Sequence, residues 1–449
     1  MPWNHLWALV LVPVMLAACT PEAPGSPAEQ TLATSVAGTL EALPTPEPTN
    51  GPIATAAAPT QTSAAKLPPH PATRQLAFTD QGDLWLLEDR QEPRRLTQIG
   101  HIVSVQFSLD GQSLLYERQD DQRDLYELRY IQADGHGDRL LLHHGILDAL
   151  YPLDDALHIL PDQIEFTPDS SGILFNTRLV FEGPGLVKND DLLNLDLASG
   201  AITPILPRGA GGDFTRSPDG SMLAISRPME LHAVWADGRP LAFTPVSFPA
   251  VMTYSEYAYY PPVVWSPDSS RFGSLVPSVD PFAPDAGGQV WIIRVPEGEI
   301  ESYNFVEGQT FFPQSRKRSL LSPSLNHIAY FRETDEANIV DLVIAAPDGS
   351  DPQPYATGQL RWLGWHPSGD GFAYSETGGP IYFGQLQQDA VNLGEGIRLL
   401  WAGERDYLLL AGRRGEWRLA EGEIGGEVRT LLNLSTQDIA LDLWPKAGK

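Results

Sequence analysis

The sequence predicts an all-β protein, a β-propeller of about eight four-stranded blades, with seven blades as the alternative. Three observations lead to this prediction. A turn motif of the form Ser-Pro-Asp-Gly recurs between short apolar strands from Gln75 onward. Its copies lie 44 to 59 residues apart, and such a period is typical of propeller blades. The first repeat lacks a strand before it, and the last lacks strands after it, so the two ends can complete one blade.

The N-terminal residues predict export. Leu6 to Ala18 are uncharged and, as a helix, would cover roughly 20 Å, less than the ~30 Å of a bilayer core. This length is typical of a signal peptide, although the five residues before it contain no Lys or Arg. The segment ends in Leu-Ala-Ala-Cys, which resembles the bacterial lipobox. We therefore expect residues 1–18 to be a signal peptide and Cys19, the only cysteine, to carry a membrane-anchoring lipid.

A stalk is expected between the anchor and the repeats. Residues 20–73 contain 11 prolines, and most of the others are Ala, Thr, Ser, Glu and Gly. Such a segment cannot bury enough apolar surface to offset the entropy of ordering. Residues 19–73 are therefore expected to form a disordered linker, and residues 74–449 the propeller domain.

The turn motif has a physical basis in each copy. Proline presets φ at the first central position, Asp or Ser caps the turn with its side chain, and Gly accepts a positive φ. The six copies are VQFSLDGQSLLYE from Val105, IEFTPDSSGILFN from Ile164, FTRSPDGSMLAIS from Phe214, VVWSPDSSRFGSL from Val263, LLSPSLNHIAYF from Leu320 and LGWHPSGDGFAYS from Leu363.

Each unit continues with a third strand, a second turn such as Ala-Asp-Gly at Ala236, and a fourth strand. These repeats resemble the blades of TolB-like propellers and related WD-like repeats of exported bacterial proteins. The resemblance covers residues 75 to about 445. It implies a fold and not a function, because this fold hosts many activities.

The ends of the repeat region determine the number of blades. Residues 75–97 contain strands two to four of a blade, and residues 439–444 contain a first strand with nothing after it. Pairing the two segments would remove both free sheet edges. Residues 396–432 form a further blade with a degenerate turn, which brings the count to eight.

Long loops indicate which face of the disc binds other molecules. Consecutive strands alternate in direction, so the long segments at 143–162, 180–189, 246–262, 277–288 and 305–318 all belong to one face. Binding residues concentrate in such loops. The candidates are aromatic residues and the one dense basic cluster: Tyr151, Tyr254, Tyr257, Tyr259, Tyr260, Phe282, Phe311, Phe312, Arg316, Lys317 and Arg318. The alternatives are that the rings pack the loops together and that the charges are merely solvated.

Charge excludes one class of partner. The formal net charge is −27 with a pI near 4.6, so nucleic-acid binding is not expected. Asn189, Asp190 and Asp191 lack the spacing of a calcium loop, and no cofactor or metal site is predicted. Among the histidines, His143–His144 begin a long loop and His101 precedes a first strand. Three histidines that met at the mouth of the channel would make a metal site, but the sequence favours histidines that are solvated or cap the core.

The absence of a nucleophile motif favours a binding function. No G-x-S-x-G, H-E-x-x-H or phosphate-binding loop occurs in the sequence. We expect a non-catalytic binding or scaffold module for an envelope protein or glycan. Its expected location is the outer face of the cytoplasmic membrane, or the periplasm or outer membrane if the host has one. The alternative is a metal-dependent carbohydrate-active enzyme, similar to polysaccharide lyases, with its site at the axial mouth.

Overall fold

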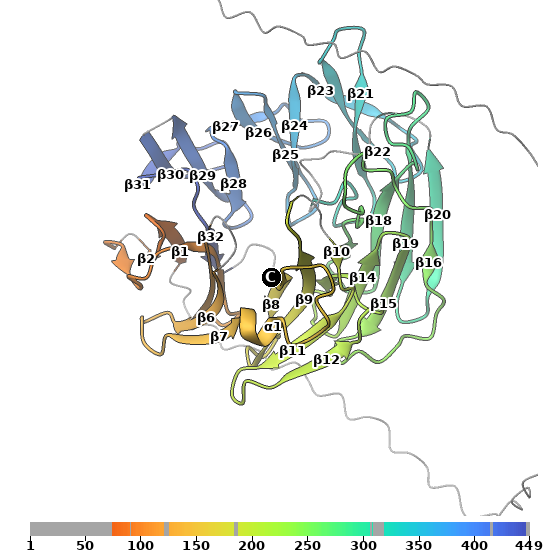
Figure 1. Ribbon diagram of the computed structural model, residues 1–449. Helices are drawn as coiled ribbons and strands as arrows, with labels where there is room; N and C mark the ends of the chain where they lie inside the picture. The colour runs from red at the N-terminus through yellow and green to blue at the C-terminus, as the bar shows by residue number, and fades with distance from the viewer. Residues whose placement is uncertain are drawn as a thin grey trace, which may run out of the picture. The chain divides into compact units, whose positions relative to one another are not determined.

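The computed structural model describes residues 74–445 except 90, 121–124, 184–186, 306–307, 309–317 and 414–415. Cys19 and the predicted stalk lie outside the described residues, as do four candidate binding residues: Phe311, Phe312, Arg316 and Lys317. Within the described ranges the fold is all-β, and eight sheets follow one another around a ring (Figure 1). The predicted β-propeller is confirmed with eight blades, which excludes the alternative of seven.

The first four blades lie between residues 75 and 247, with one strand supplied from the C-terminal end. Blade one contains β32 (Leu441–Trp444), β1 (Gln75–Asp80), β2 (Asp83–Glu88) and β3 (Arg94–Arg95). Blade two contains β4 (Ile102–Phe107), β5 (Ser113–Gln119), β6 (Tyr126–Gln132) and β7 (Arg139–His143). Blade three contains β8 (His158–Phe166), β9 (Gly172–Val180), β10 (Val187–Lys188), β11 (Leu192–Asp196) and β12 (Ile202–Leu206). Blade four contains β13 (Asp213–Arg216), β14 (Met222–Arg227), β15 (Glu230–Trp235) and β16 (Val246–Ser247).

The other four blades continue the ring. Blade five contains β17 (Val264–Trp265), β18 (Arg271–Pro277), β19 (Gly288–Arg294) and β20 (Glu299–Phe305). Blade six contains β21 (Ile328–Glu333), β22 (Val340–Ala345) and β23 (Gln353–Gly358). Blade seven contains β24 (Leu360–Trp365), β25 (Phe372–Glu376), β26 (Pro380–Gly384) and β27 (Val391–Glu395). Blade eight contains β28 (Arg398–Trp401), β29 (Asp406–Arg413), β30 (Glu416–Glu423) and β31 (Arg429–Leu434).

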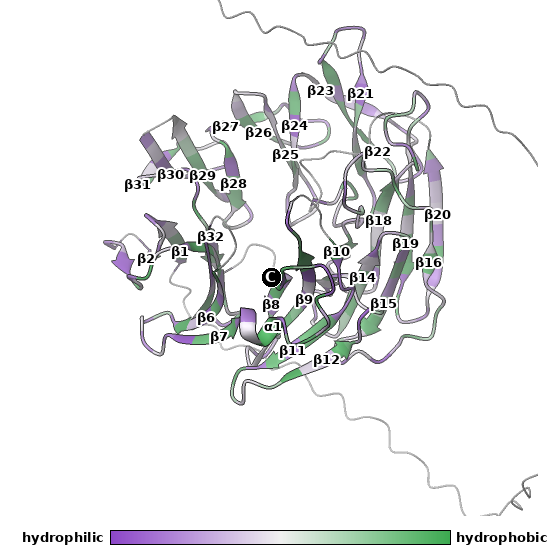
Figure 2. Cartoon of the chain, viewed as in Figure 1, coloured by the Kyte–Doolittle hydropathy of each residue, from purple (hydrophilic) through white to green (hydrophobic). Residues whose placement is uncertain are grey.

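The core lies between neighbouring blades. The second strand of a blade is covered by a blade on each side, and accordingly β9 is buried at every residue except Arg178. The fourth strand lies at the outer edge, and most of β20 is exposed. Figure 2 shows this division as apolar residues along strands such as β11, β15 and β19 and polar residues in many connecting loops.

The ring is closed by the C-terminal strand, as predicted. β32 pairs antiparallel with β1, with Gln75 opposite Trp444 and Phe78 opposite Leu441. The indole of Trp444 donates to the carbonyl oxygen of Leu109 in blade two at 3.0 Å. It also lies against Gly111, where a Cβ would come within 2.4 Å of the indole ring. The last segment of the chain therefore joins blade eight to both blade one and blade two.

The predicted turn chemistry is present in the structure. In the turn of blade five, the Ser266 hydroxyl donates to Asp268 at 2.6 Å and accepts from the amide of Arg271 at 3.0 Å. The Asp268 carboxylate also accepts from the amide of Ser270 at 3.1 Å, and the hydrogen bond from Ser266 is the main cause that lowers the Asp268 pKa to about 2. The same arrangement occurs at Ser217 and Asp219 in blade four.

Two first strands differ from the prediction. Residues 143–162 were expected to be one long loop, but they contain α1 (His144–Leu147) and the start of β8 at His158. Pro161 interrupts the apolar pattern in the sequence, and the structure accommodates it with a register shift between Pro161 and Ile164. In blade six the first strand is reduced to one bridge between Leu321 and Ile328.

No helix in the described ranges is long and apolar enough to cross a membrane.

Candidate functional site

The face that carries the long loops is called the loop face here. Each blade is antiparallel, so the second-to-third loops and the inter-blade connections emerge on the same side of the ring. The tight Ser-Pro-Asp-Gly turns emerge on the opposite side. The predicted binding residues within the described ranges therefore belong to segments of the loop face, but they occupy three different environments.

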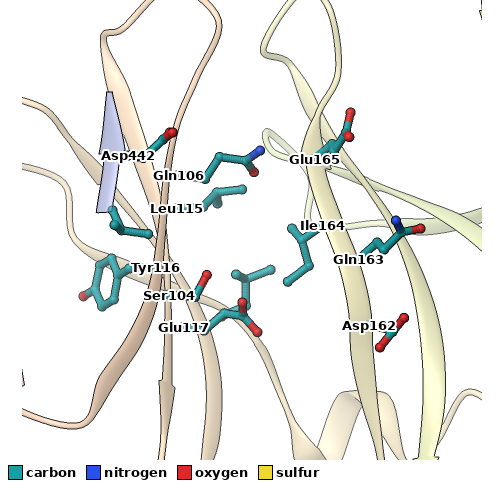
Figure 3. Close-up of a pocket in the computed structure, with 12 residues that line it drawn as sticks. Ser104, Gln106, Leu115, Tyr116, Glu117, Asp162, Gln163, Ile164, Glu165 and Asp442 are labelled. Atoms are coloured by element: carbon teal, nitrogen blue, oxygen red, sulfur yellow. The ribbon is translucent and has the colours of Figure 1, made fainter. Parts of the chain in front are cut away.

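A polar pocket lies between the inner strands of blades one to three (Figure 3). It has a volume of about 400 Å³ and is lined mainly by β4, β5 and β8. Four carboxylates line it, and none of its lining residues is basic. They are contributed by three blades: Glu117, Asp162, Glu165 and Asp442. Such a lining favours a ligand that is cationic or rich in hydroxyl groups over an anionic one.

Each pocket carboxylate has a partner from the surrounding protein. Asp442 accepts the amide of Phe107 at 2.7 Å, and Glu117 accepts the hydroxyl of Tyr126 at 3.2 Å. Glu165 lies 3.5 Å from the guanidinium of Arg216. These contacts hold the acidic groups in place.

The fourth carboxylate, Asp162, belongs to a buried ionic cluster next to the pocket. We call Asp162, Lys188, Asp190, Asp213 and Tyr260 the lysine cluster. The Lys188 ammonium lies 2.7 Å from Asp162, pairs also with Asp213, and lies 4.2 Å from the centre of the Tyr260 ring. Burial alone would lower the Lys188 pKa, but the two carboxylates outweigh it and raise the pKa above its ordinary value. Lys188 therefore remains charged and links blade three to blade four.

A break in the third strand of blade three places Lys188 there. β10 and β11 both pair with β9, and the chain between them leaves the sheet with Asp190 at a φ of 47°. At this break the Asp191 carboxylate accepts hydrogen bonds from the amide and from the hydroxyl of Thr177 in β9, both at 2.7 Å. The amide of Thr177 therefore has a side-chain partner from the broken strand. Burial raises the pKa of Asp191 despite these hydrogen bonds.

Two of the candidate tyrosines are held by this break. The Tyr260 hydroxyl donates to Asp190 at 2.8 Å, and the Tyr151 hydroxyl interacts with Asp191 closely enough for that carboxylate to raise its pKa. Burial, then these carboxylates, raise the pKa of both tyrosines. The guanidinium of Arg208 also lies over Tyr151, 5.5 Å from the centre of the tyrosine ring. Both tyrosines are thus part of the structure around the lysine cluster.

Other candidates are packed inside the domain. Tyr259 is 8% exposed and belongs to the core between blades four and five, while Tyr257 is half-buried. Arg318 is also half-buried, and its guanidinium donates to the carbonyl oxygen of Trp362 at 3.4 Å. Tyr259 therefore packs its loop against the core and does not belong to the exposed surface.

Tyr254 and Phe282 are exposed and lie together. Their rings are 5.6 Å apart, and their exposed fractions are 66% and 51%. Met252 and Val279 join the same two loops, since the amide of Met252 donates to the carbonyl oxygen of Val279 at 2.8 Å, and both residues are more than 40% exposed. We call these four residues the aromatic patch. Interaction with the Asp280 carboxylate raises the pKa of the Tyr254 hydroxyl.

The three histidines considered in the sequence do not meet. His101 is exposed and has a φ of 60°, and the imidazole of His143 accepts the amide of Gly145 at 3.0 Å. His144 instead lies beside His158, with ring centres 3.9 Å apart. No pattern in the sequence indicated this pair, because the two histidines lie on separate elements with a loop between them.

Comparison of the sequence with protein-family models and with curated proteins returns no match. Among solved structures, the chain is similar to dipeptidyl peptidase 4 from Porphyromonas gingivalis, with 13% identity and a TM-score of 0.42. This alignment covers 73% of the chain and 53% of the peptidase, so the chain spans about half the length of that protein.

Two further solved structures are similar to a comparable degree. TolB from Acinetobacter baumannii has 14% identity and a TM-score of 0.34, covering 80% of this chain and 78% of TolB. An oligogalacturonate lyase in complex with manganese has 12% identity and a TM-score of 0.41, covering 81% of this chain and 87% of the lyase. At these values the similarities carry no argument about the activity, ligand or partner of this chain.

Proposed function

We propose that this chain is a non-catalytic binding module, displayed outside the cytoplasmic membrane by a lipid on Cys19, that binds a protein of the cell envelope through its loop face. The observation that carries the proposal is the aromatic patch. It brings two aromatic and two aliphatic side chains to the surface from neighbouring loops of blades four and five.

The composition of the patch favours a protein partner. Four large apolar side chains exposed together are more than the scattered single residues found on most surfaces, and such groups mark interaction sites. Tyr254 combines apolar area with a polar hydroxyl, as aromatic residues at protein interfaces do. A glycan would be expected to use more hydrogen-bonding groups than Met252 and Val279 supply.

Photo-crosslinking in intact host cells tests this proposal. A photoreactive amino acid at Phe282 is expected to capture a defined envelope protein, and adding Tyr254→Ala is expected to reduce the capture several-fold. The matched control position is Ile397, a loop-face side chain with 44% exposure between blades seven and eight. Equal capture from the two positions, or no capture from Phe282, would count against the proposal. Capture of glycan instead of protein would change the class of partner.

A metal-dependent carbohydrate-active enzyme with its site at the axial mouth is the second candidate. The carboxylate-lined pocket among the inner strands of blades one to three supports it, because hydroxyl-rich ligands suit such a lining. Release of oligosaccharides from a polysaccharide panel in the presence of a divalent metal would favour this candidate, particularly if Glu117→Gln abolished the release.

A further inference from the structure

We propose that His144, Asp148 and His158 form a site for a divalent transition metal, with Zn²⁺ as the ion whose chemistry fits best. The site lies in the connection between blades two and three, on the loop face. It is separate from the aromatic patch and does not depend on the partner proposed there. A ligand atom from each of the three side chains lies within 4.8 Å of the others.

The backbone around the three residues is well defined. The imidazole of His143 caps α1 by accepting the amide of Gly145, and the amide of Asp148 donates to the carbonyl oxygen of His144 at 2.8 Å. This single helical turn places His144 and Asp148 on the same side, because residues four apart in a helix are neighbours. His158 begins β8, where it pairs with Val180, so the third side chain comes from the sheet.

The distances are close to those of a filled site. The Nδ1 atom of His158 lies 2.9 Å from one carboxylate oxygen of Asp148. Ligand atoms bound about 2.0–2.2 Å from a tetrahedral Zn²⁺ lie roughly 3.3–3.6 Å from one another. His144 and His158 have ring centres 3.9 Å apart at 34°. The three ligand atoms lie within 4.8 Å of one another, and we expect rotation of the side chains to direct them at one ion.

Outer contacts orient the ligands and leave access for the ion. The second carboxylate oxygen of Asp148 accepts the amide of Ile159 at 2.8 Å, which fixes the carboxylate relative to His158. The Asp148 and His158 side chains are 22% and 30% exposed, so solvent reaches them and a water molecule can complete the coordination. Two imidazoles and one carboxylate suit Zn²⁺ and its transition-metal neighbours, whereas Ca²⁺ and Mg²⁺ prefer oxygen ligands alone.

The site lies beside the carboxylate-lined pocket. The ring of His144 lies 6.2 Å from that of Tyr126, which is buried and donates to the pocket residue Glu117. Tyr126 therefore stands between the three ligands and the pocket. A bound ion would connect α1 to β8 and hold the connection between blades two and three beside the pocket.

Zinc titration of the full mature chain tests the inference. After treatment with a chelator, the protein is titrated with Zn²⁺ by calorimetry and its thermal unfolding is followed with and without Zn²⁺. We expect one ion per chain and a Tm that rises with the zinc concentration, since the ion binds the folded state. The variant H144A/H158A is expected to lose about tenfold or more in affinity and to lose the Tm shift.

Two further variants separate metal binding from folding. D148N keeps an oxygen that can accept the amide of Ile159 but removes the charge, and it is also expected to lower zinc affinity. H136A removes a histidine whose side chain is 84% exposed outside the cluster, and it should bind zinc as the unsubstituted chain does. The inference is overturned if the unsubstituted chain binds no stoichiometric zinc. It is equally overturned if H144A/H158A and D148N, folded by circular dichroism, bind zinc unchanged.

Discussion

At the scale of single residues, Lys188 shows how one buried cation connects two blades. Its side chain is 6% exposed, and its two carboxylate partners, Asp162 and Asp213, are 13% and 26% exposed. A buried ion pair gains little overall because both charges lose hydration, but removing one partner leaves the other uncompensated. Here the loss of Lys188 would remove the ammonium that Asp162 and Asp213 share, and Arg178, 3.7 Å from Asp162, would remain as a cationic partner of Asp162.

We expect Lys188→Met to lower the free energy of unfolding by about 3 kcal/mol, measured by urea denaturation. Adding Asp162→Asn and Asp213→Asn should recover most of this loss, because the uncompensated charges are then gone. The control is Arg239→Met, which breaks an ion pair whose side chains are 71% and 56% exposed and should cost less than about 0.5 kcal/mol. If Lys188→Met lowered the free energy of unfolding no more than the control does, solvent would already compensate the charges of Asp162 and Asp213.

At the scale of secondary-structure elements, β32 contributes more than its four residues suggest. It supplies the first strand of blade one, and Leu441 and Leu443 join Leu408 and Leu410 of blade eight in one apolar cluster. Asp442 accepts the amide of Phe107, and Trp444 reaches blade two. One short strand thus connects three blades.

Deleting residues 437–449 is therefore expected to lower Tm strongly and to promote aggregation, because the edge of β1 becomes free. The milder change Trp444→Ala should lower the free energy of unfolding by about 2 kcal/mol, because it removes a half-buried indole that covers Gly111 and donates to the carbonyl oxygen of Leu109 in blade two. Trp235→Ala, at an indole of β15 that is equally half-buried but lies beside Arg239, outside the ring closure, serves as the control and should cost less. Unchanged thermal unfolding of the truncated chain would contradict the role assigned to β32.

At the scale of the whole molecule, the proposed arrangement is an acidic disc held to a membrane by a lipid at one end of the chain. The net charge of −27 disfavours adhesion to anionic lipid headgroups, so the lipid on Cys19 would have to supply the attachment. The loop face would then be free to meet a partner in the envelope.

Cys19→Ala is expected to move the protein from the membrane fraction to the soluble fraction of the host, because no lipid can then be attached. Fractionation followed by immunodetection measures this, with His136→Ala as a control that should remain in the membrane fraction. A Cys19→Ala protein that stays with the membranes would contradict lipid anchoring.

The sequence by itself predicted the β-propeller and the closure of the ring, because both depend on local signals that repeat. It left eight or seven blades open, and the structure decided for eight. The hydroxyl of Ser266 and the carboxylate of Asp268 complete their turn within a few residues, so the turn can be recognised without tertiary structure. The unpaired first strand at the C-terminal end likewise predicted the pairing of β32 with β1.

Only the tertiary structure decided which charged and aromatic side chains meet. Lys188 reaches Asp213 because the third strand of blade three breaks after β10, and His144 reaches His158 because β8 begins before Pro161. The tertiary structure also decided that Tyr254 lies at the surface and Tyr259 in the core. The physical reason is that these contacts cross between elements whose relative positions follow from blade packing, which leaves no fixed spacing along the chain.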